Sequence, residues 1–551
     1  MTLVPVKMRR AHRCKPRRLP VLLVFVVALS LFGRFPAPAQ AASPTIPDTP
    51  IGAVLSEMLD VIRSGDIEKA RDFVTRRYAA EALAARPMES RLDGWRDLMG
   101  SLAQPKLLEV RTGSGNPAMI IESGATGEVF EVVVRPAPGV PDKITGVRMQ
   151  STIPGKPAIP AGPITDKERS ALIDQLLDRL VADDRFSGVV MLAKDGKPAY
   201  QRATGMANQS WSIPNRIDTK FCLGSMNKMF TSLAVARLVQ DGKLAYGDKV
   251  GKYLPDFPNA AVREKVTIHH LLTHTSGLGS YFDDPEYALD WTRMRHVSDY
   301  TTCVASESLA FEPGAEMRYS NSGFIVLGLI IEQVSGRDYY DFVRDTVLRP
   351  AGMNDSDSFE NDQVVPNLAI GYTMAGTRMR HGGAGASAPA GASQGGSGSP
   401  GAAGGAAQTR KANFYEHSAR GTPAGGGYST APDLLKFSQA LSRGSIVTAA
   451  LVDTVTTAKV AMGPGAGYGY GFGDFRGTGD GYFGHNGGAP GMSTDFRIYD
   501  KLGYTVIVLS NYDGIAGSVA DFIDQLIVPP PTGGPGPGPG GPGPGGTPGR
   551  P

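Results

Sequence analysis

The sequence predicts an α+β protein with two folded domains. One is a small α+β domain, and the larger one has an antiparallel sheet flanked by helices together with a helical subdomain. Three observations favour this fold class: the 551 residues exceed one ordinary core, helical segments precede strand-like ones in the first part, and the second part begins and ends with a predicted hairpin. The 20% charged and 41% hydrophobic residues argue against wholesale disorder and against a polytopic membrane protein.

Residues 1–41 have the pattern of a signal peptide. Seven basic residues lie within the first 18 positions, an apolar run covers Leu19 to Phe32, and small residues follow at Ala39-Gln40-Ala41. The run is shorter than the roughly 20 residues that span a bilayer, so cleavage is expected rather than membrane anchoring. We therefore expect an exported protein, periplasmic or extracellular.

The expected mature chain is acidic and contains two cysteines. The segment to Ala41 holds eight basic residues and no acidic ones, so its removal changes the formal net charge from +3 to −5. An acidic protein has no general attraction for nucleic acid. Cys222 and Cys303 are too few for a disulfide framework, and they either form one bridge or pack as buried thiols.

Residues 42–150 are predicted to form the small α+β accessory domain. Two amphipathic helical segments are followed by three strand-like runs, namely Ile51 to Ile62, Ile67 to Ala79, Met119 to Ile121, Val129 to Val134 and Ile144 to Met149. The order of helices and strands loosely resembles accessory domains of the NTF2-like type. We find no residues there that indicate chemistry.

The rest of the chain divides where the composition changes. Residues 151–163 are rich in proline and glycine and should form a linker before the second domain, residues 164–528. A Gly/Ala-rich insertion (382–407) interrupts this domain, and a Pro/Gly tail (529–551) follows it. Neither segment can bury enough apolar surface to offset its ordering entropy, so we expect a flexible surface insertion and a disordered tail.

Hairpins and helices are predicted at both ends of the second domain. The elements are a helix at Ser170 to Asp183, a hairpin of Gly188 to Leu192 with Pro198 to Ala203, a second hairpin of Phe496 to Tyr499 with Tyr504 to Leu509, and a helix at Ile515 to Ile527. The first hairpin turns at Asp195-Gly196, which tolerates the positive φ of a tight turn. The first and last strands can therefore meet in one sheet.

An S-x-x-K motif marks the candidate nucleophile. It is Ser225-Met226-Asn227-Lys228, placed where an extended segment ends and an apolar helix, Met229 to Val239, begins. One helical turn places the serine and the lysine on the same face, and burial of the helix would lower the lysine pKa toward that of a useful base. Taken alone the motif is weak evidence, because a helix N-cap serine beside a surface lysine has the same pattern.

Two further segments complete a candidate catalytic set. Tyr319 in Tyr319-Ser320-Asn321 can transfer the proton from Ser225 to a leaving group, and Asn321 can orient Lys228 and a substrate amide. In Gly484-His485-Asn486-Gly487-Gly488, His485 can bind the tyrosine or a substrate carboxylate, and Gly487 and Gly488 let a ligand lie close to the strand. The backbone N–H groups of Ser225 and Gly488 would form the oxyanion hole.

The stretch from Val266 to Leu278, VTIHHLLTHTSGL, resembles the signature segment of class C β-lactamase-related serine hydrolases. Further similar segments are Asp241-Gly242-Lys243-Leu244, Tyr253-Leu254-Pro255, Ala351-Gly352-Met353, Gly426-Gly427-Tyr428-Ser429 and Tyr470-Gly471-Phe472-Gly473. The resemblance implies a serine β-lactamase/transpeptidase-like fold and an acyl-serine intermediate, without a metal or an organic cofactor. Ser225, Lys228, Tyr319, Asn321 and His485 fall on the motif positions of the family.

The third motif departs from the K-T-G of other penicillin-recognising enzymes, because His485 replaces the lysine. A histidine titrates near 6.5, so the positive charge that would hold a carboxylate is weak at neutral pH. This lowers the expectation of efficient β-lactamase activity. An esterase or D-amino-acid peptidase is expected, and a β-lactamase or a non-catalytic cell-envelope binding protein is the alternative.

The remaining functional candidates are histidines and tyrosines. His269, His270 and His274 have no nearby carboxylate or cysteine, so we expect buried, hydrogen-bonded side chains rather than a metal site. Tyr281 and Tyr470 are either pocket walls or ordinary core residues. The expected partner is a small-molecule or peptide substrate, while cell-envelope contact, oligomeric state and a partner-binding role of residues 42–150 remain open.

Overall fold

The computed structural model describes residues 44–112, 116–124, 129–160, 162–374, 410–463 and 465–528. The expected signal peptide (1–41), the Gly/Ala-rich insertion (382–407) and the Pro/Gly tail (529–551) lie outside these ranges. Within the described ranges, no helix combines the length and the apolar character needed to cross a bilayer.

The N-terminal region has helices first and a sheet second, as the sequence predicts. Its elements are α1 (Pro50–Ser64), α2 (Ile67–Arg77), α3 (Ala80–Ala85), α4 (Met88–Ser101), β1 (Lys106–Arg111), β2 (Ala118–Glu122), β3 (Val129–Ala137) and β4 (Val140–Ser151). The strands form an antiparallel sheet in the order β1-β2-β3-β4. The Thr49 side chain accepts a hydrogen bond at the start of α1, and Gly65 ends this helix with a φ of 62°. The likeness to NTF2-like domains stays a prediction.

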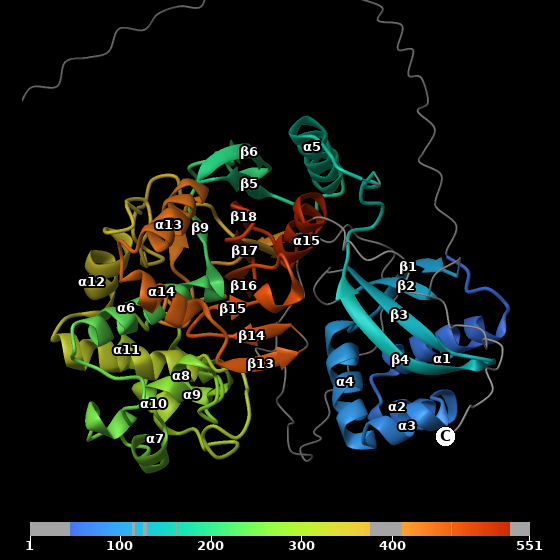
Figure 1. Cartoon of the computed structure of the whole chain (residues 1–551), viewed down its shortest axis with the longest axis horizontal. Helices are drawn as coiled ribbons and strands as arrows, with labels where there is room; N and C mark the ends of the chain where they lie inside the picture. Colours follow the sequence, from blue (N-terminus) through green and yellow to red (C-terminus); the bar gives the residue numbers. More distant parts are fainter. Residues whose placement is uncertain are drawn as a thin grey trace, which may run out of the picture. The chain divides into compact units, whose positions relative to one another are not determined.

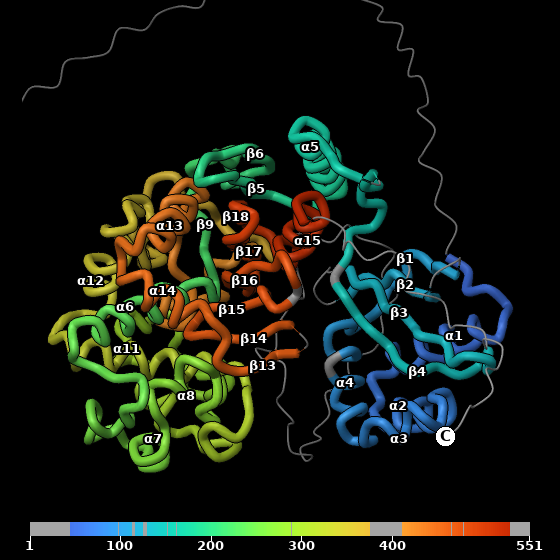
Figure 2. Tube along the Cα trace, viewed as in Figure 1, coloured from blue at the N-terminus to red at the C-terminus, as the bar shows by residue number. Residues whose placement is uncertain are grey.

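The larger region is built on an eight-stranded antiparallel sheet. Its strands are β5 (Gly188–Lys194), β6 (Lys197–Thr204), β13 (Val460–Gly463), β14 (Ala466–Tyr468), β15 (Gly473–Asp474), β16 (Phe483–Ala489), β17 (Met492–Tyr499) and β18 (Tyr504–Ser510). Their order is β13-β14-β15-β16-β17-β18-β5-β6. The predicted terminal hairpins therefore meet, because β18 pairs with β5 although the two are far apart in the sequence (Figure 2).

Successive residues of the central strands supply two different cores. Val190 and Leu192 pack with residues of α5 (Asp166–Ala182) and α15 (Ala516–Ile527). Val189 and Met191 instead belong to the large core that contains the central helices. Because side chains alternate across a strand, this sheet is covered on both faces, which explains the continuous apolar run of β5. Figure 1 shows α5 and α15 close to β5 and β18.

Most of the remaining chain forms a helical region. Its α-helices are α6 (Asn227–Gln240), α7 (Ala260–Lys265), α8 (Ile268–Leu272), α9 (Pro285–Asp290), α10 (Thr301–Ala305), α11 (Ser322–Ser335), α12 (Tyr339–Val343), α13 (Ala431–Arg443) and α14 (Ala449–Thr456). Short paired strands connect them, namely β7 (Met206–Asn208) with β8 (Ile213–Pro214), β9 (Phe221–Cys222) with β12 (Tyr428–Ser429), and β10 (Tyr372–Met374) with β11 (Arg410–Ala412).

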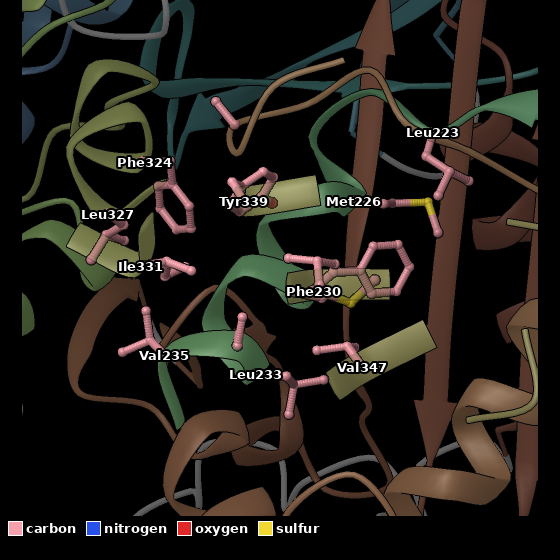
Figure 3. Packing of buried hydrophobic residues seen from close by; sticks show 14 of the residues in the cluster. Leu223, Met226, Phe230, Leu233, Val235, Phe324, Leu327, Ile331, Tyr339 and Val347 are labelled. Carbon is pink, nitrogen blue, oxygen red and sulfur yellow. The ribbon is translucent and has the colours of Figure 1, made fainter. Parts of the chain in front are cut away.

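Helix α6 lies inside the core, as its apolar composition predicts. Phe230 and Leu233 of this helix are buried among Phe324 and Ile331 of α11 (Figure 3). Eleven of its 14 residues are buried, so it has no broad polar face. This packing gives the S-x-x-K motif a rigid, dry support.

Candidate active site

Ser225 lies in a single 3-10 turn, η1 (Gly224–Met226), between β9 and α6. The side chains of Leu223 and Met226 on either side of Gly224-Ser225 are fully buried and anchor this turn in the apolar core (Figure 3). Gly224 has a φ of 54°, and a Cβ at this position would lie 2.9 Å from the backbone N of Gly488. A glycine is therefore required here for both backbone conformation and space.

Lys228 is fully buried one turn after Ser225. Its Nζ lies 3.3 Å from Ser225 Oγ, 2.8 Å from Asn321 Oδ1 and 2.6 Å from the carbonyl oxygen of Ala424. Burial in this site lowers the pKa of Lys228 well below its ordinary value, because the charged ammonium loses its hydration. The sequence predicted this direction, whereas the contact with Ala424 was not foreseen.

Tyr319 and Asn321 approach Lys228 from the segment that leads into α11. Lys228 Nζ lies 4.7 Å from the centroid of the Tyr319 ring. Burial raises the pKa of Tyr319, and a hydrogen bond with Ser225 acts in the opposite direction. Asn321 donates from Nδ2 to Ser280 Oγ at 3.1 Å, which directs its Oδ1 toward Lys228. The structure thus brings Ser225, Lys228, Tyr319 and Asn321 together.

His485 lies inside β16, with its ring centroid 6.5 Å from that of Tyr319. Its Nε2 is 2.9 Å from the hydroxyl of Tyr468, and its Nδ1 faces the carbonyl oxygen of Asn486 at 2.5 Å. The carbonyl accepts from Nδ1–H, so Tyr468 donates to Nε2. The histidine thus binds a tyrosine, but that tyrosine is Tyr468 rather than the expected Tyr319. Burial and the charge of Lys228 lower the pKa of His485 to about 4.

Gly487 and Gly488 bring β16 against the turn that holds Ser225. Gly487 pairs with Thr494 and Gly488 with Ser493 of β17, while Thr494 Oγ1 donates to the carbonyl oxygen of Leu223 at 2.8 Å. A Cβ on Gly487 would overlap that carbonyl, whereas a Cβ on Gly488 would have no atom within 4 Å. The strand can approach this closely only because residue 487 is a glycine.

We expect Gly487→Ala to displace β16 from η1, to destabilise the fold by about 1–3 kcal/mol and to lower turnover. Gly488→Ala is the matched control, because the added methyl group meets open space and the N–H remains. Thermal unfolding of both variants, followed by circular dichroism, measures the difference. Equal melting temperatures for the two variants would contradict this role of Gly487.

A cavity of about 260 Å³ opens beside Ser225. Aromatic side chains form much of its wall, and its lining includes Tyr281, Phe282, Tyr287, Tyr319, Asn321 and Gly488. Tyr281 lines this cavity and is also part of the buried core, so both expected possibilities hold for it. Tyr470 instead packs on Tyr246, with ring centroids 4.5 Å apart, and contacts His269 Nδ1 through its hydroxyl at 2.9 Å.

The three closely spaced histidines each have a hydrogen-bond partner at Nδ1, but only His274 is fully buried, whereas His269 and His270 are half-buried. His270 accepts from the backbone N–H of Thr267 at 3.2 Å, and His274 accepts from that of Ser320 at 3.1 Å. Cys222 and Cys303 are free thiols, and burial raises the pKa of each to about 11. Of the two expected possibilities, the one with two separate thiols is therefore correct, and no disulfide bridge joins the two cysteines.

Sequence reasoning missed Tyr468, the partner of His485. Tyr468 and Tyr470 lie two positions apart in the same glycine-rich stretch, Gly465-Ala466-Gly467-Tyr468-Gly469-Tyr470. No local pattern separates the tyrosine that reaches His485 from the one that reaches His269. Only the pairing of β14 with β15 and of β15 with β16 distinguishes them.

Comparison with known proteins agrees with this fold and with the serine-hydrolase class. The family model "Beta-lactamase" matches residues 173–525. The chain belongs to this β-lactamase family.

Related proteins carry several different names. The chain is 34% identical over 205 residues to penicillin-binding protein 4* of Bacillus subtilis, covering 36% of this chain and 45% of that protein. It is 36% identical over 199 residues to esterase EstB of Burkholderia gladioli, covering 34% and 50% respectively. The chain therefore spans about half the length of the curated relatives it matches.

Two solved structures with the same fold belong to proteins with different names. A penicillin-binding protein from Bacillus halodurans has a TM-score of 0.54 at 29% identity, covering 64% of this chain and 98% of that one. A D-stereospecific amidohydrolase from Streptomyces sp. has a TM-score of 0.51 at 23% identity, covering 65% and 98%. The second similarity shows the fold alone.

Proposed function

We propose that this chain is an exported serine hydrolase that acts through an acyl-serine intermediate on an ester or an amide, as an esterase or a D-amino-acid peptidase. One observation carries the proposal: Lys228 Nζ lies 3.3 Å from Ser225 Oγ in a site that favours the neutral amine. A hydroxyl next to a buried base is the arrangement that nucleophilic catalysis requires.

The hydrogen bonds of Lys228 leave its lone pair for Ser225. A neutral amine has two N–H donors, and its two shortest contacts, to Ala424 O and Asn321 Oδ1, are with carbonyl oxygens that can only accept. The lone pair is then available for the proton of Ser225. Deprotonation lets Oγ attack the substrate carbonyl carbon, and the leaving group departs with a proton delivered through Tyr319. Water then hydrolyses the acyl-serine.

The negative charge on the substrate oxygen needs donors close to Ser225. We assign this role to the backbone N–H groups of Ser225 and Gly488, which the approach of β16 to η1 brings near each other. Loss of one such donor typically reduces the rate by about a hundred- to a thousand-fold.

The electrostatics of β16 favour substrates without an essential carboxylate. A pKa of about 4 makes His485 neutral at neutral pH, so it cannot supply the positive charge that a lysine would supply. The aromatic walls of the cavity suit an apolar acyl group. Both features support an ester or a neutral amide over a β-lactam.

A substrate panel tests the proposal. Purified protein is assayed with short-chain p-nitrophenyl esters, D-amino-acid amides and a chromogenic β-lactam, and we expect turnover of the first or second class with little of the third. Absence of turnover with all three, together with saturable ligand binding, would support the alternative of a non-catalytic envelope-binding protein. Export is tested separately by N-terminal sequencing of the secreted protein, which should begin at residue 42.

A further inference from the structure

His274 contacts both neighbours of Tyr319 and the Tyr319 ring itself. Its backbone carbonyl accepts from the N–H of Arg318 at 2.8 Å, and its Nδ1 accepts from the N–H of Ser320 at 3.1 Å. The imidazole lies on the Tyr319 ring, with ring centroids 4.3 Å apart and a tilt of 36°. One residue thus holds the three-residue segment 318–320 at three points.

The backbone and burial of His274 fit this arrangement. Its φ is 61°, a left-handed conformation that is uncommon for residues other than glycine, although histidine, asparagine and aspartate adopt it more often than the rest. The side chain is fully buried, and burial lowers the pKa of His274 well below its usual value. The ring is therefore neutral at neutral pH, and Nδ1 keeps the lone pair that accepts from Ser320.

Nε2, the other ring nitrogen of His274, has an environment that is unusual for a side chain with only a packing role. Because Nδ1 accepts, the proton must be on Nε2, and Nε2 is buried without a hydrogen-bond partner among the described residues. The ring is enclosed by Tyr319, Tyr468 and Phe324, with centroid distances of 4.3, 4.7 and 5.4 Å. An unpartnered buried N–H is costly, so packing alone would favour an apolar ring here.

We propose that His274 is a positioning residue that holds Tyr319 against Ser225 and Lys228. The inference rests on the proposed function, because it assigns His274 an effect on catalysis through Tyr319. The Ser320 hydrogen bond fixes the backbone on one side of Tyr319, the Arg318 hydrogen bond fixes it on the other side, and the stacked ring fixes the rotation of the phenol. A displacement of about 1 Å at a catalytic group can cost about a hundred-fold in rate.

Three substitutions separate the contributions of the ring and of the acceptor. His274→Phe keeps an aromatic ring and removes the acceptor, and His274→Gly removes both while tolerating the positive φ. His274→Asn supplies a side-chain oxygen close to the position of Nδ1 and also tolerates this backbone conformation. We expect kcat to fall about 10- to 100-fold in the Gly variant, which loses both contacts, and to fall less in the Phe and Asn variants, which each keep one of them, with KM within about twofold throughout.

His270→Phe is the matched control. His270 also accepts a backbone N–H at Nδ1, from Thr267, but has no ring contact with Tyr319 among the described contacts. We expect this variant to lose thermal stability while its kcat stays within about twofold of the wild type. Equal losses of kcat in the His270 and His274 variants would show a general structural effect and overturn the proposal.

A double-mutant cycle with Tyr319→Phe supplies the decisive readout. If His274 acts through the Tyr319 hydroxyl, His274→Gly should cost kcat little once that hydroxyl is absent, so the two effects should be strongly non-additive. Additive effects would overturn the positioning role. If the wild type itself neither turns over substrate nor reacts with a fluorophosphonate, the proposed function fails instead, and the two failures are distinguishable.

Discussion

Replacement of Ser225 by alanine should abolish turnover, with a fall in kcat of about 10⁴- to 10⁶-fold. Among the described hydrogen-bond partners of the Lys228 amine, only Ser225 supplies a hydroxyl, and the substitution removes it. No covalent acyl-enzyme can then form, so any residual rate would come from the oxyanion donors and binding alone. The measurement is steady-state kinetics on the best substrate, with the intact mass recorded after exposure to a fluorophosphonate.

The alanine variant should keep its fold, which separates chemistry from stability. The contacts of Lys228 with Asn321 and Ala424 do not involve the Ser225 hydroxyl, so we expect them to remain in the variant. Ser210→Ala, at an exposed position, is the matched control and should retain both the adduct and the turnover. A wild-type adduct that persists unchanged in Ser225→Ala would place the reactive group elsewhere and defeat the assignment.

The ends of the large sheet could be predicted because their determinants are local. Asp195 and Gly196 form the turn between β5 and β6 with φ values of 51° and 73°, as the dipeptide predicts. The strands on the other side of the sheet, β13, β14 and β15, were not predicted. These strands are two to four residues long. They lie in a glycine-rich stretch, where no alternation of apolar and polar residues marks a strand.

In the candidate site, too, the local contacts could be predicted from the sequence and the contacts between different elements could not. Ser225 and Lys228 are linked by one turn of helix, so their proximity follows from spacing alone. The contacts of His485 with Tyr468 and of His274 with Ser320 join different elements, 17 and 46 residues apart in the chain. Such contacts depend on sheet order and helix packing, which a single sequence does not specify.

The Lys228 amine should prove the second essential group. We expect Lys228→Met to lower kcat/KM by about 10²- to 10⁴-fold, because no base remains to accept the Ser225 proton. Lys228→Arg is the informative partner, since it keeps a positive charge that cannot be neutralised in the accessible pH range. If the neutral amine is the active form, Arg should fail as completely as Met, whereas near-normal activity of Arg would mean that only charge is needed.

The pH dependence of the wild-type acylation rate shows whether the neutral amine or the ammonium form of Lys228 is active. Burial lowers the pKa of Lys228, so the fraction of neutral amine, and with it the acylation rate, should rise as the pH rises through this lowered pKa. His485, with a pKa of about 4, titrates in the acid range.

The free energy of unfolding should also rise with pH. Between the folded pKa of Lys228 and the unfolded value of 10.5, the unfolded chain binds one more proton than the folded chain. Lys228→Met should remove both slopes, and an acylation rate that falls with rising pH in the wild type would show that the ammonium is the active form.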